Sequence, residues 1–152
     1  MATRGWEFAY MLDGSNATPV IRDFILSTAA AHKVGDLMVI ETDGDLTQAA
    51  ATATEVTAVC QEAVAAASIT AGTTQAKCAI ITRNQVWRCS SDSTAISAVI
   101  GVTKTNDIVD CNTVDADNTD HGSLILVDKS QSDDDGNLIF YAVFADTTFG
   151  NT

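Results

Sequence analysis

Short apolar runs separated by turn residues are the feature that most constrains the fold of this 152-residue chain. The runs are rich in Val, Ile, Cys and aromatic residues and end at Asn, Asp, Ser or Gly, which is typical of β-strands. Nine glycines and one proline occur, and the glycines lie mostly between the runs, as turns require. Five such runs are residues 76–82, 85–89, 98–103, 123–128 and 138–145. Strands at this spacing predict a mainly β barrel or sandwich.

Three segments add detail to this prediction. Residues 36–48 hold two apolar runs around an Asp43-Gly44 turn, which predicts a hairpin. Residues 138–145 are almost continuously apolar, so we expect a strand that is central or buried by a partner. Residues 48–71 are rich in Ala, but their β-branched residues weaken a helix, and we expect strand there. We expect at most one or two short helices, near residues 93–98 or 106–111.

The first twenty residues are rich in aromatic side chains, namely Trp6, Phe8 and Tyr10. We therefore divide the chain into an N-terminal arm or edge segment, residues 1–20, and a single β-rich domain, residues 21–152. Protein interfaces are enriched in aromatic residues, Met and Arg. The predicted partner-binding residues are Arg4, Trp6, Phe8, Tyr10, Met11 and Arg22. The alternative is an edge strand that packs on its own core.

The charge balance narrows the choice of partners. Eight Lys and Arg residues stand against 20 Asp and Glu residues, which gives a formal net charge of −12. Such a surface repels phosphate backbones and anionic lipids, so we expect neither nucleic-acid nor membrane binding. No run approaches the roughly 20 apolar residues that cross a bilayer, and the first residues lack an apolar signal-peptide core. We therefore expect synthesis in a cytosol.

The sequence contains no recognisable catalytic motif. The two histidines, His32 and His121, lie in loop-like surroundings, and P-loop, nucleophile-elbow and zinc-protease motifs are absent. The Asp-rich stretches at residues 115–120 and 133–137 lack the spacing of an EF-hand loop. We therefore predict no enzymatic activity, no cofactor and no metal site.

The four cysteines are Cys60, Cys78, Cys89 and Cys111, spaced too widely for a CxxC metal or redox motif. In a reducing compartment we expect free thiols that act as small core residues. The alternative is that one or two pairs oxidise after release from a cell. Four cysteines allow three complete pairings, and the sequence does not select one.

The order of the segments resembles that of small bacteriophage capsid decoration, or cement, proteins. It begins with KVGDLMVI at residues 33–40 and DGDLTQA at residues 43–49. The further matching segments are residues 57–64, 69–73, 76–81, 98–102 and 138–144. Cys60 departs from the pattern, since such sequences often carry Gly at this place.

The resemblance implies a β-barrel or β-tulip-like domain that forms a homotrimer on the outer surface of an assembled phage head. Its partner would be the major capsid protein, and its location the virion, after synthesis in the host cytoplasm. In a trimer, the apolar C-terminal region is the expected subunit contact, because an exposed apolar strand promotes aggregation. The predicted contact residues are Phe140, Phe144 and Phe149. The alternative is a phage tail, fibre or other virion surface protein that binds a host receptor or glycan.

Overall fold

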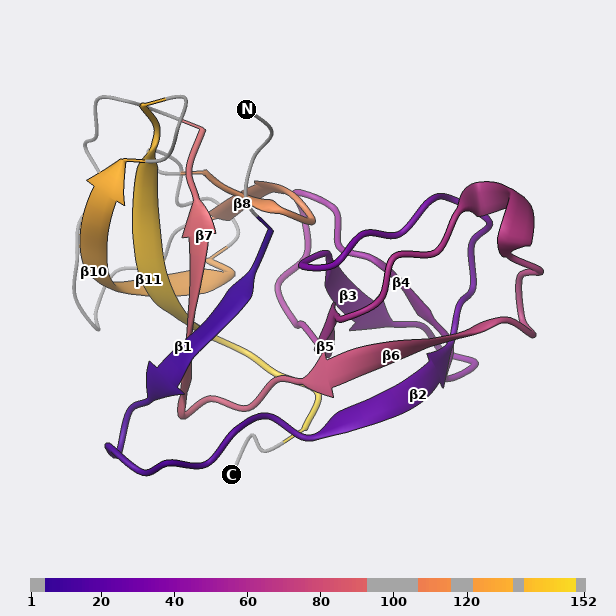
Figure 1. The fold of residues 1–152 in the computed structure, drawn as a ribbon, viewed down its shortest axis with the longest axis horizontal. Helices are drawn as coiled ribbons and strands as arrows, with labels where there is room; N and C mark the ends of the chain where they lie inside the picture. Colours follow the sequence, from indigo (N-terminus) through magenta and orange to yellow (C-terminus); the bar gives the residue numbers. More distant parts are fainter. Residues whose placement is uncertain (1–4, 93–106, 116–121, 133–135, 150–152) are drawn as a thin grey trace.

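The computed structural model describes residues 5–92, 107–115, 122–132 and 136–149, with side chains omitted at 129–132. This part of the chain is mainly β and forms two antiparallel sheets and a separate hairpin (Figure 1). One 3-10 turn, Ala66–Ser68, is the helical element among the described residues. None of the helical structure described is long and apolar enough to cross a membrane.

Sheet A consists of four strands. In spatial order they are β1 (Glu7–Met11), β7 (Gln85–Ser90), β11 (Leu138–Phe144) and β10 (Leu124–Ser132). Because β11 lies between β7 and β10, the prediction of a central C-terminal strand is confirmed. Phe140, Ala142 and Phe144 of β11 point inwards, with the two-residue repeat expected of a strand.

Sheet B consists of five strands. In spatial order they are β2 (Ile21–Ile25), β6 (Gln75–Ile80), β5 (Ala58–Cys60), β3 (Leu37–Ile40) and β4 (Leu46–Gln48). The predicted hairpin of residues 36–48 is confirmed as β3 and β4. The sheet curls so that one parallel bridge, from Leu26 to Leu46, joins its two edges. The mainly β class is therefore confirmed, whereas the described strands do not close into a barrel.

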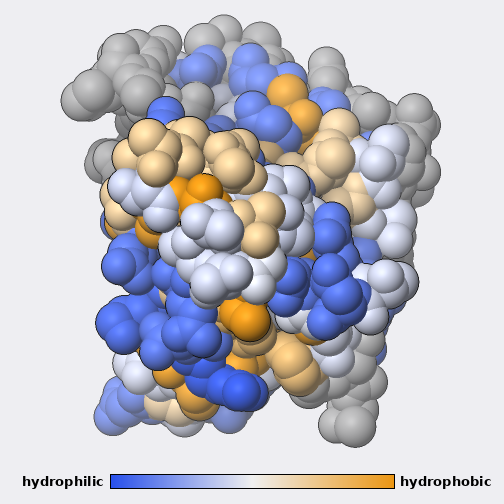
Figure 2. All heavy atoms as spheres, turned by 90° about the vertical axis from the view of Figure 1, so that its right-hand side faces the viewer, coloured by the Kyte–Doolittle hydropathy of each residue, from blue (hydrophilic) through white to orange (hydrophobic). Residues whose placement is uncertain are grey.

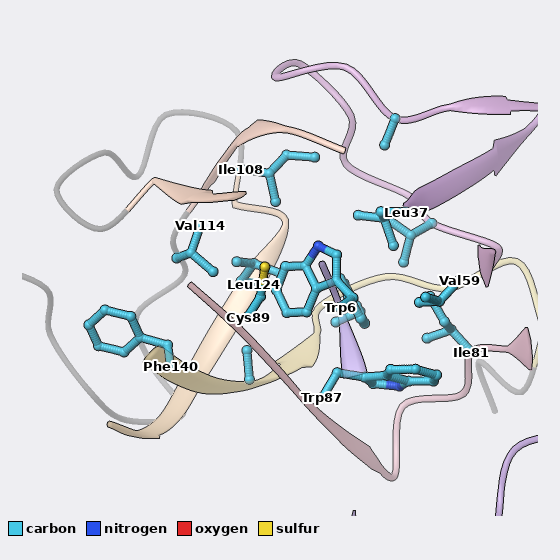
Figure 3. Packing of buried hydrophobic residues seen from close by; sticks show 14 of the residues in the cluster. Trp6, Leu37, Val59, Ile81, Trp87, Cys89, Ile108, Val114, Leu124 and Phe140 are labelled. Carbon is cyan, nitrogen blue, oxygen red and sulfur yellow. The ribbon is translucent and has the colours of Figure 1, made fainter. Parts of the chain in front are cut away.

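Sheet B separates two apolar cores because its side chains alternate between its faces. Leu37, Val59 and Ala79 point towards sheet A and belong to the main core (Figure 3). The second core lies on the other face of sheet B. Its buried members are Leu26, Met38, Leu46, Ala58, Cys60, Ile69, Ala76 and Cys78. The inner strands β3 and β5 are therefore covered on both faces, as their continuous apolar sequences require.

One expectation about local structure was wrong, and another was confirmed only in part. Instead of a short helix at residues 106–111, the chain forms β8 (Asp107–Asp110), which pairs with β9 (Thr113–Asp115). Ile108 and Val114 anchor this hairpin in the main core, and their burial overrides the local preference. The strand expected within residues 48–71 is confirmed at β5, whereas residues 61–64 contribute only a single bridge, at Val64. The predicted segments at residues 93–98 and 98–103 lie outside the described residues.

Candidate interaction surface

The N-terminal segment runs along the edges of both sheets. β1 is an outer strand of sheet A, β2 is an outer strand of sheet B, and residues 12–20 connect them along the lower side of Figure 1. Backbone hydrogen bonds of 2.8 Å anchor both ends of this connection, from Leu12 N–H to the Asn84 carbonyl and from Ile80 N–H to the Val20 carbonyl. Residues 7–11 are thus an edge strand on the chain's own core, followed by a connection between the sheets.

A groove of about 780 Å³ lies beside this connection. Its walls are Met11, Thr18, Val20, Arg22, Ile80, Thr82, Arg83, Asn84 and Gln85. Arg22 and Arg83 are the charged members of this set, although the whole chain carries a net charge of −12. Two guanidinium groups beside apolar walls favour a ligand that carries carboxylates and apolar side chains.

The two arginines are held in place by contacts that leave donors available. An Nη2–H of Arg83 donates to the Ala145 carbonyl at 2.8 Å. The Arg22 guanidinium lies over the Phe24 ring, 5.7 Å from its centroid. Within the described ranges, no carboxylate forms an ion pair with either arginine. Because a guanidinium has five N–H donors, each arginine can still bind a carboxylate in a bidentate manner.

A second, smaller hollow of about 140 Å³ lies on the other side of the same segment. It is lined by Phe8, Thr18, Pro19, Ile21, Gln61, Ala79 and Trp87. Thr18 lines both hollows, so residues 18–22 lie between them. Val20 and Ile21 on this segment are 63% and 56% exposed. The segment therefore presents apolar side chains next to two hollows that a partner's side chains could enter.

One side of the β2 backbone is unoccupied in the first half of the strand. Val20 and Leu26 make their backbone hydrogen bonds towards β6, and hydrogen-bonding direction alternates along an antiparallel strand. The N–H and C=O groups of Ile21, Asp23 and Ile25 therefore point away from β6. Among the described strands, none pairs with β2 on that side at Ile21 or Asp23, whereas directly after Ile25 the chain meets β4 there, through the Leu26–Leu46 bridge. Such an edge can accept an additional strand.

The predicted partner-binding residues fall into different environments. Met11 and Arg22 line the groove, Phe8 lines the second hollow, and Tyr10 is 46% exposed. Trp6 differs from the prediction, because its ring is 1% exposed and lies in the main core between the two sheets (Figure 3). The structure thus brings together Phe8, Met11 and Arg22 around residues 18–22, and separates Trp6 from them.

The predicted subunit-contact residues also lie mainly inside the chain. Phe140 and Phe144 are 0% and 1% exposed, and the Phe144 ring packs on Trp6 with centroids 4.9 Å apart. These two rings are therefore not exposed for the expected contact with another subunit. Phe149 is half-buried, and its carbonyl accepts a hydrogen bond from the Thr147 hydroxyl at 2.7 Å. Arg4 lies outside the described residues.

Sequence reasoning missed Arg83, Asn84 and Val20 as members of the surface. One signal was available, because Arg83 lies in a short turn between two predicted strands, where a cation must be near the surface. Its position near Arg22 depends on the pairing of β2 with β6, which joins residues 50 to 58 positions apart. Local sequence patterns do not contain that information.

The remaining candidate groups do not form a second site. His32 is 2% exposed and both of its ring nitrogens lack a hydrogen-bond partner in the described structure. The described residues contain no group of three or more His, Cys, Asp or Glu that could hold a metal ion. His121 and most of the Asp-rich stretches lie outside the described residues. The face in Figure 2 mixes hydrophilic and apolar residues without a broad apolar area.

The groove, the second hollow and the β2 edge can bind another molecule through backbone hydrogen bonds, guanidinium groups and apolar contacts. We refer to them together as the β2 surface. Comparison of the chain with known protein families, with curated proteins and with solved structures gives no match.

Proposed function

We propose that the chain is a bacteriophage capsid decoration protein that binds the outer surface of the assembled head and stabilises contacts between major capsid protein subunits. The sequence resemblance supports this proposal, and the structural observation that carries it is the β2 surface. An open strand edge beside a groove with two arginines fits an extended, acidic segment of another protein. The role requires binding and no chemical step.

Strand addition gives this surface a specific mode of binding. A partner segment would bond to the outward N–H and C=O groups of Ile21 and Asp23, and place alternate side chains towards the groove. Its carboxylates would pair with Arg22 and Arg83. Charge complementarity of this kind speeds association and selects the register of the bound segment.

The assembled head explains why modest contacts are sufficient. A head filled with DNA is under outward pressure, and a protein that bridges neighbouring subunits adds contacts that exist only in the assembled lattice. A homotrimer would present three β2 surfaces, so the contacts reinforce one another by avidity. The net charge of −12 keeps a protein made in many copies soluble.

Co-sedimentation with phage heads tests the proposal. The wild-type protein should pellet with expanded heads and much less with unexpanded ones. The double variant Arg22→Gln/Arg83→Gln should lose most of this binding, whereas Lys33→Gln, which removes an exposed positive charge outside the groove, should retain it. Equal recovery of the wild type with and without expanded heads would contradict the proposal.

The expected homotrimer is tested separately by light scattering. The proposal predicts a particle of three times the 15.9 kDa chain mass. A stable monomer at micromolar concentration would argue against trimeric decoration, and would leave single-copy binding to the head as the remaining form of the proposal.

A second candidate function is a virion surface protein that binds a host glycan. The observation in its favour is an aromatic pair on the outer side of sheet A, Tyr10 and Tyr141, whose ring centroids lie 6.2 Å apart. Exposed aromatic rings can stack on sugars, and Tyr10 is 46% exposed. Glycan-array binding that is lost in Tyr10→Ala, together with no binding to expanded heads, would favour this function.

A further inference from the structure

Two of the four thiols lie directly opposite each other in sheet B. Cys60 on β5 is the register partner of Cys78 on β6. Both side chains are 0% exposed and point into the second core. The Cys60 thiol donates to the Glu62 carbonyl at 3.0 Å, and the Cys78 thiol donates to the Ala76 carbonyl at 3.8 Å. The fold thus brings together two reactive groups that are eighteen positions apart in the sequence.

The backbone hydrogen bonds of Cys60 show whether Cys60 and Cys78 form a hydrogen-bonded or a non-hydrogen-bonded pair of the antiparallel ladder. The Cys60 N–H donates to the Asp36 carbonyl, and the Cys60 carbonyl accepts from Gly35 N–H, both at 2.8 Å. Both backbone groups of Cys60 therefore point away from β6. Cys60 and Cys78 consequently form a non-hydrogen-bonded pair, in which Cα atoms lie about 4.5 Å apart and side chains are closest. Disulfides span Cα separations of about 4.4–6.8 Å, so this pair can be bridged without moving the strands.

The other two cysteines belong to the main core, on the opposite face of sheet B from Cys60 and Cys78. The Cys89 thiol donates to the Asn112 carbonyl at 3.0 Å. The Cys111 thiol interacts with the carboxylate of Asp36 and is half-buried. The structure therefore favours a single bridge, between Cys60 and Cys78, with Cys89 and Cys111 left as thiols.

We propose that Cys60 and Cys78 are an oxidation site that forms an intramolecular disulfide when the folded protein meets a hydroperoxide. This inference does not depend on the proposed function, since it rests on strand register alone. Residues 61–63, directly after Cys60, are exposed, so a small opening of this segment admits an oxidant of the size of hydrogen peroxide.

The chemistry assigns different roles to the two sulfurs. Cys60 is the attacking sulfur because it directly precedes the exposed residues 61–63, and the neighbouring Cys78 thiol also lowers its pKa. The Cys60 sulfur and burial raise the pKa of the Cys78 thiol. The Cys60 thiolate attacks hydrogen peroxide, so an S–O bond forms, the O–O bond breaks and one water leaves after protonation. The Cys78 sulfur then attacks the Cys60 sulfur, and the S–O bond breaks with release of a second water. Two thiols are oxidised and one peroxide is reduced to two waters.

The disulfide would close a loop that covers the second core. Residues 61–77 lie between the two sulfurs and contain the 3-10 turn Ala66–Ser68 and the buried Ile69. Linking the ends of this loop reduces the conformational freedom of the unfolded chain. The oxidised protein is therefore more stable than the reduced protein, by about 6–12 °C in Tm for a loop and chain of this size.

Peptide mapping tests the site on the wild-type protein. Trypsin places each cysteine in its own peptide, namely residues 34–77, 78–83, 89–104 and 105–129. The folded protein is treated with hydrogen peroxide, its remaining thiols are alkylated in denaturant, and the digest is analysed without reduction. We expect a linked species of residues 34–77 and 78–83, while Cys89 and Cys111 are alkylated. Four alkylated cysteines, or a link that includes Cys89 or Cys111 in place of this one, would overturn the proposal.

Serine variants test the roles of the two sulfurs. In Cys78→Ser, peroxide should leave Cys60 as a sulfenic acid that dimedone labels, whereas in Cys60→Ser it should leave Cys78 as a thiol. Cys89→Ser is the matched control and should retain both the linked species and the increase in Tm. Dimedone labelling of Cys78 in Cys60→Ser at the rate seen for Cys60 would contradict the assigned roles. If a variant does not fold, the peptide map of the wild type decides the proposal without it.

Discussion

Gly5 and Gly35 meet backbone to backbone where the start of sheet A approaches sheet B. A Cβ atom on Gly35 would lie 2.7 Å from the Gly5 Cα, and Gly35 has a φ of +96°. The Trp6 N–H donates to the Gly35 carbonyl at 2.8 Å, directly beside this contact. The absence of side chains at these two positions thus lets the Trp6 backbone come close enough to place its ring in the main core.

Substitution of Gly35 should therefore be more harmful than substitution at another glycine with positive φ. Gly44 has a φ of +92° and no atom near its missing Cβ, so Gly44→Ala should lower the free energy of unfolding by about 1 kcal/mol. Gly35→Ala adds the clash and should cost about 3 kcal/mol or more. Urea unfolding of both variants measures the difference, and equal losses would show that the close contact does not constrain the fold.

The half-buried thiol of Cys111 should make stability depend on alkaline pH. Burial, with Asp36 and Asp110 nearby, raises the pKa of Cys111 from 9.0 to about 12. Above pH 9 the thiol of the unfolded chain ionises while that of the folded chain stays protonated, which favours unfolding. This contribution to stability is complete below pH 9 and is lost as the pH rises towards 12. Tm against pH should fall less steeply for Cys111→Ser than for the wild type, and parallel curves would contradict the assignment.

β1 shows how a single strand combines a structural and an exposed side. Trp6, just before it, is buried in the main core, Phe8 packs edge to face on Trp87 with centroids 5.6 Å apart, and Tyr10 is exposed. Glu7 on its outer side pairs with Arg88 of β7 at 2.7 Å. Aromatic residues are enriched in protein interfaces, and they also occur in edge strands that pack on a core. The aromatic composition of residues 6–10 therefore does not distinguish the two roles.

Alanine substitution should separate these two sides of the segment. Trp6→Ala removes a large buried ring and should lower the free energy of unfolding by about 3–5 kcal/mol. Tyr10→Ala changes an exposed side chain and should alter it by no more than about 0.5 kcal/mol. Thermal unfolding followed by circular dichroism measures both. A large loss for Tyr10→Ala would mean that the outer side of sheet A is covered in solution.

The sequence predicted those strands whose own residues show a clear β pattern. The hairpin of β3 and β4 follows from alternating apolar residues around an Asp-Gly turn, and β6, β7, β10 and β11 follow from runs of β-branched and aromatic residues. β8 was not predicted, because its strand form depends on burial of Ile108 against distant residues. The β2 surface depends in the same way on the pairing of β2 with β6, so the sequence indicated only some of its residues.

At the scale of the whole molecule, the dominant property is the net charge of −12. Like charges at this density repel one another and destabilise the compact state, while the two arginines of the groove attract acidic partners. Salt screens both interactions, since the Debye length falls from about 10 Å at 0.1 M to about 3 Å at 1 M. Added salt should therefore increase the stability of the folded chain and decrease its affinity for an acidic partner.

Added sodium chloride should raise the Tm of the isolated protein and weaken its retention on expanded heads. Calorimetry and co-sedimentation over the same range of salt concentration measure the two effects. Sodium chloride is preferred to sulfate, which stabilises proteins by exclusion from their surface as well as by screening. A Tm that falls with sodium chloride would show that attractive ion pairs outweigh the repulsion of the acidic surface.

The pairing of β1 with β7 also has a consequence for the time course of synthesis. Glu7 and Arg88 are register partners 81 positions apart. At about 5–20 residues per second, a ribosome needs on the order of 4–16 s to reach Arg88 after adding Glu7. During that interval Trp6 and Phe8 have been made but their neighbours in sheet A have not. The nascent chain therefore exposes its first aromatic residues during that interval, and sheet A is complete only after β11 and β10 have joined β7.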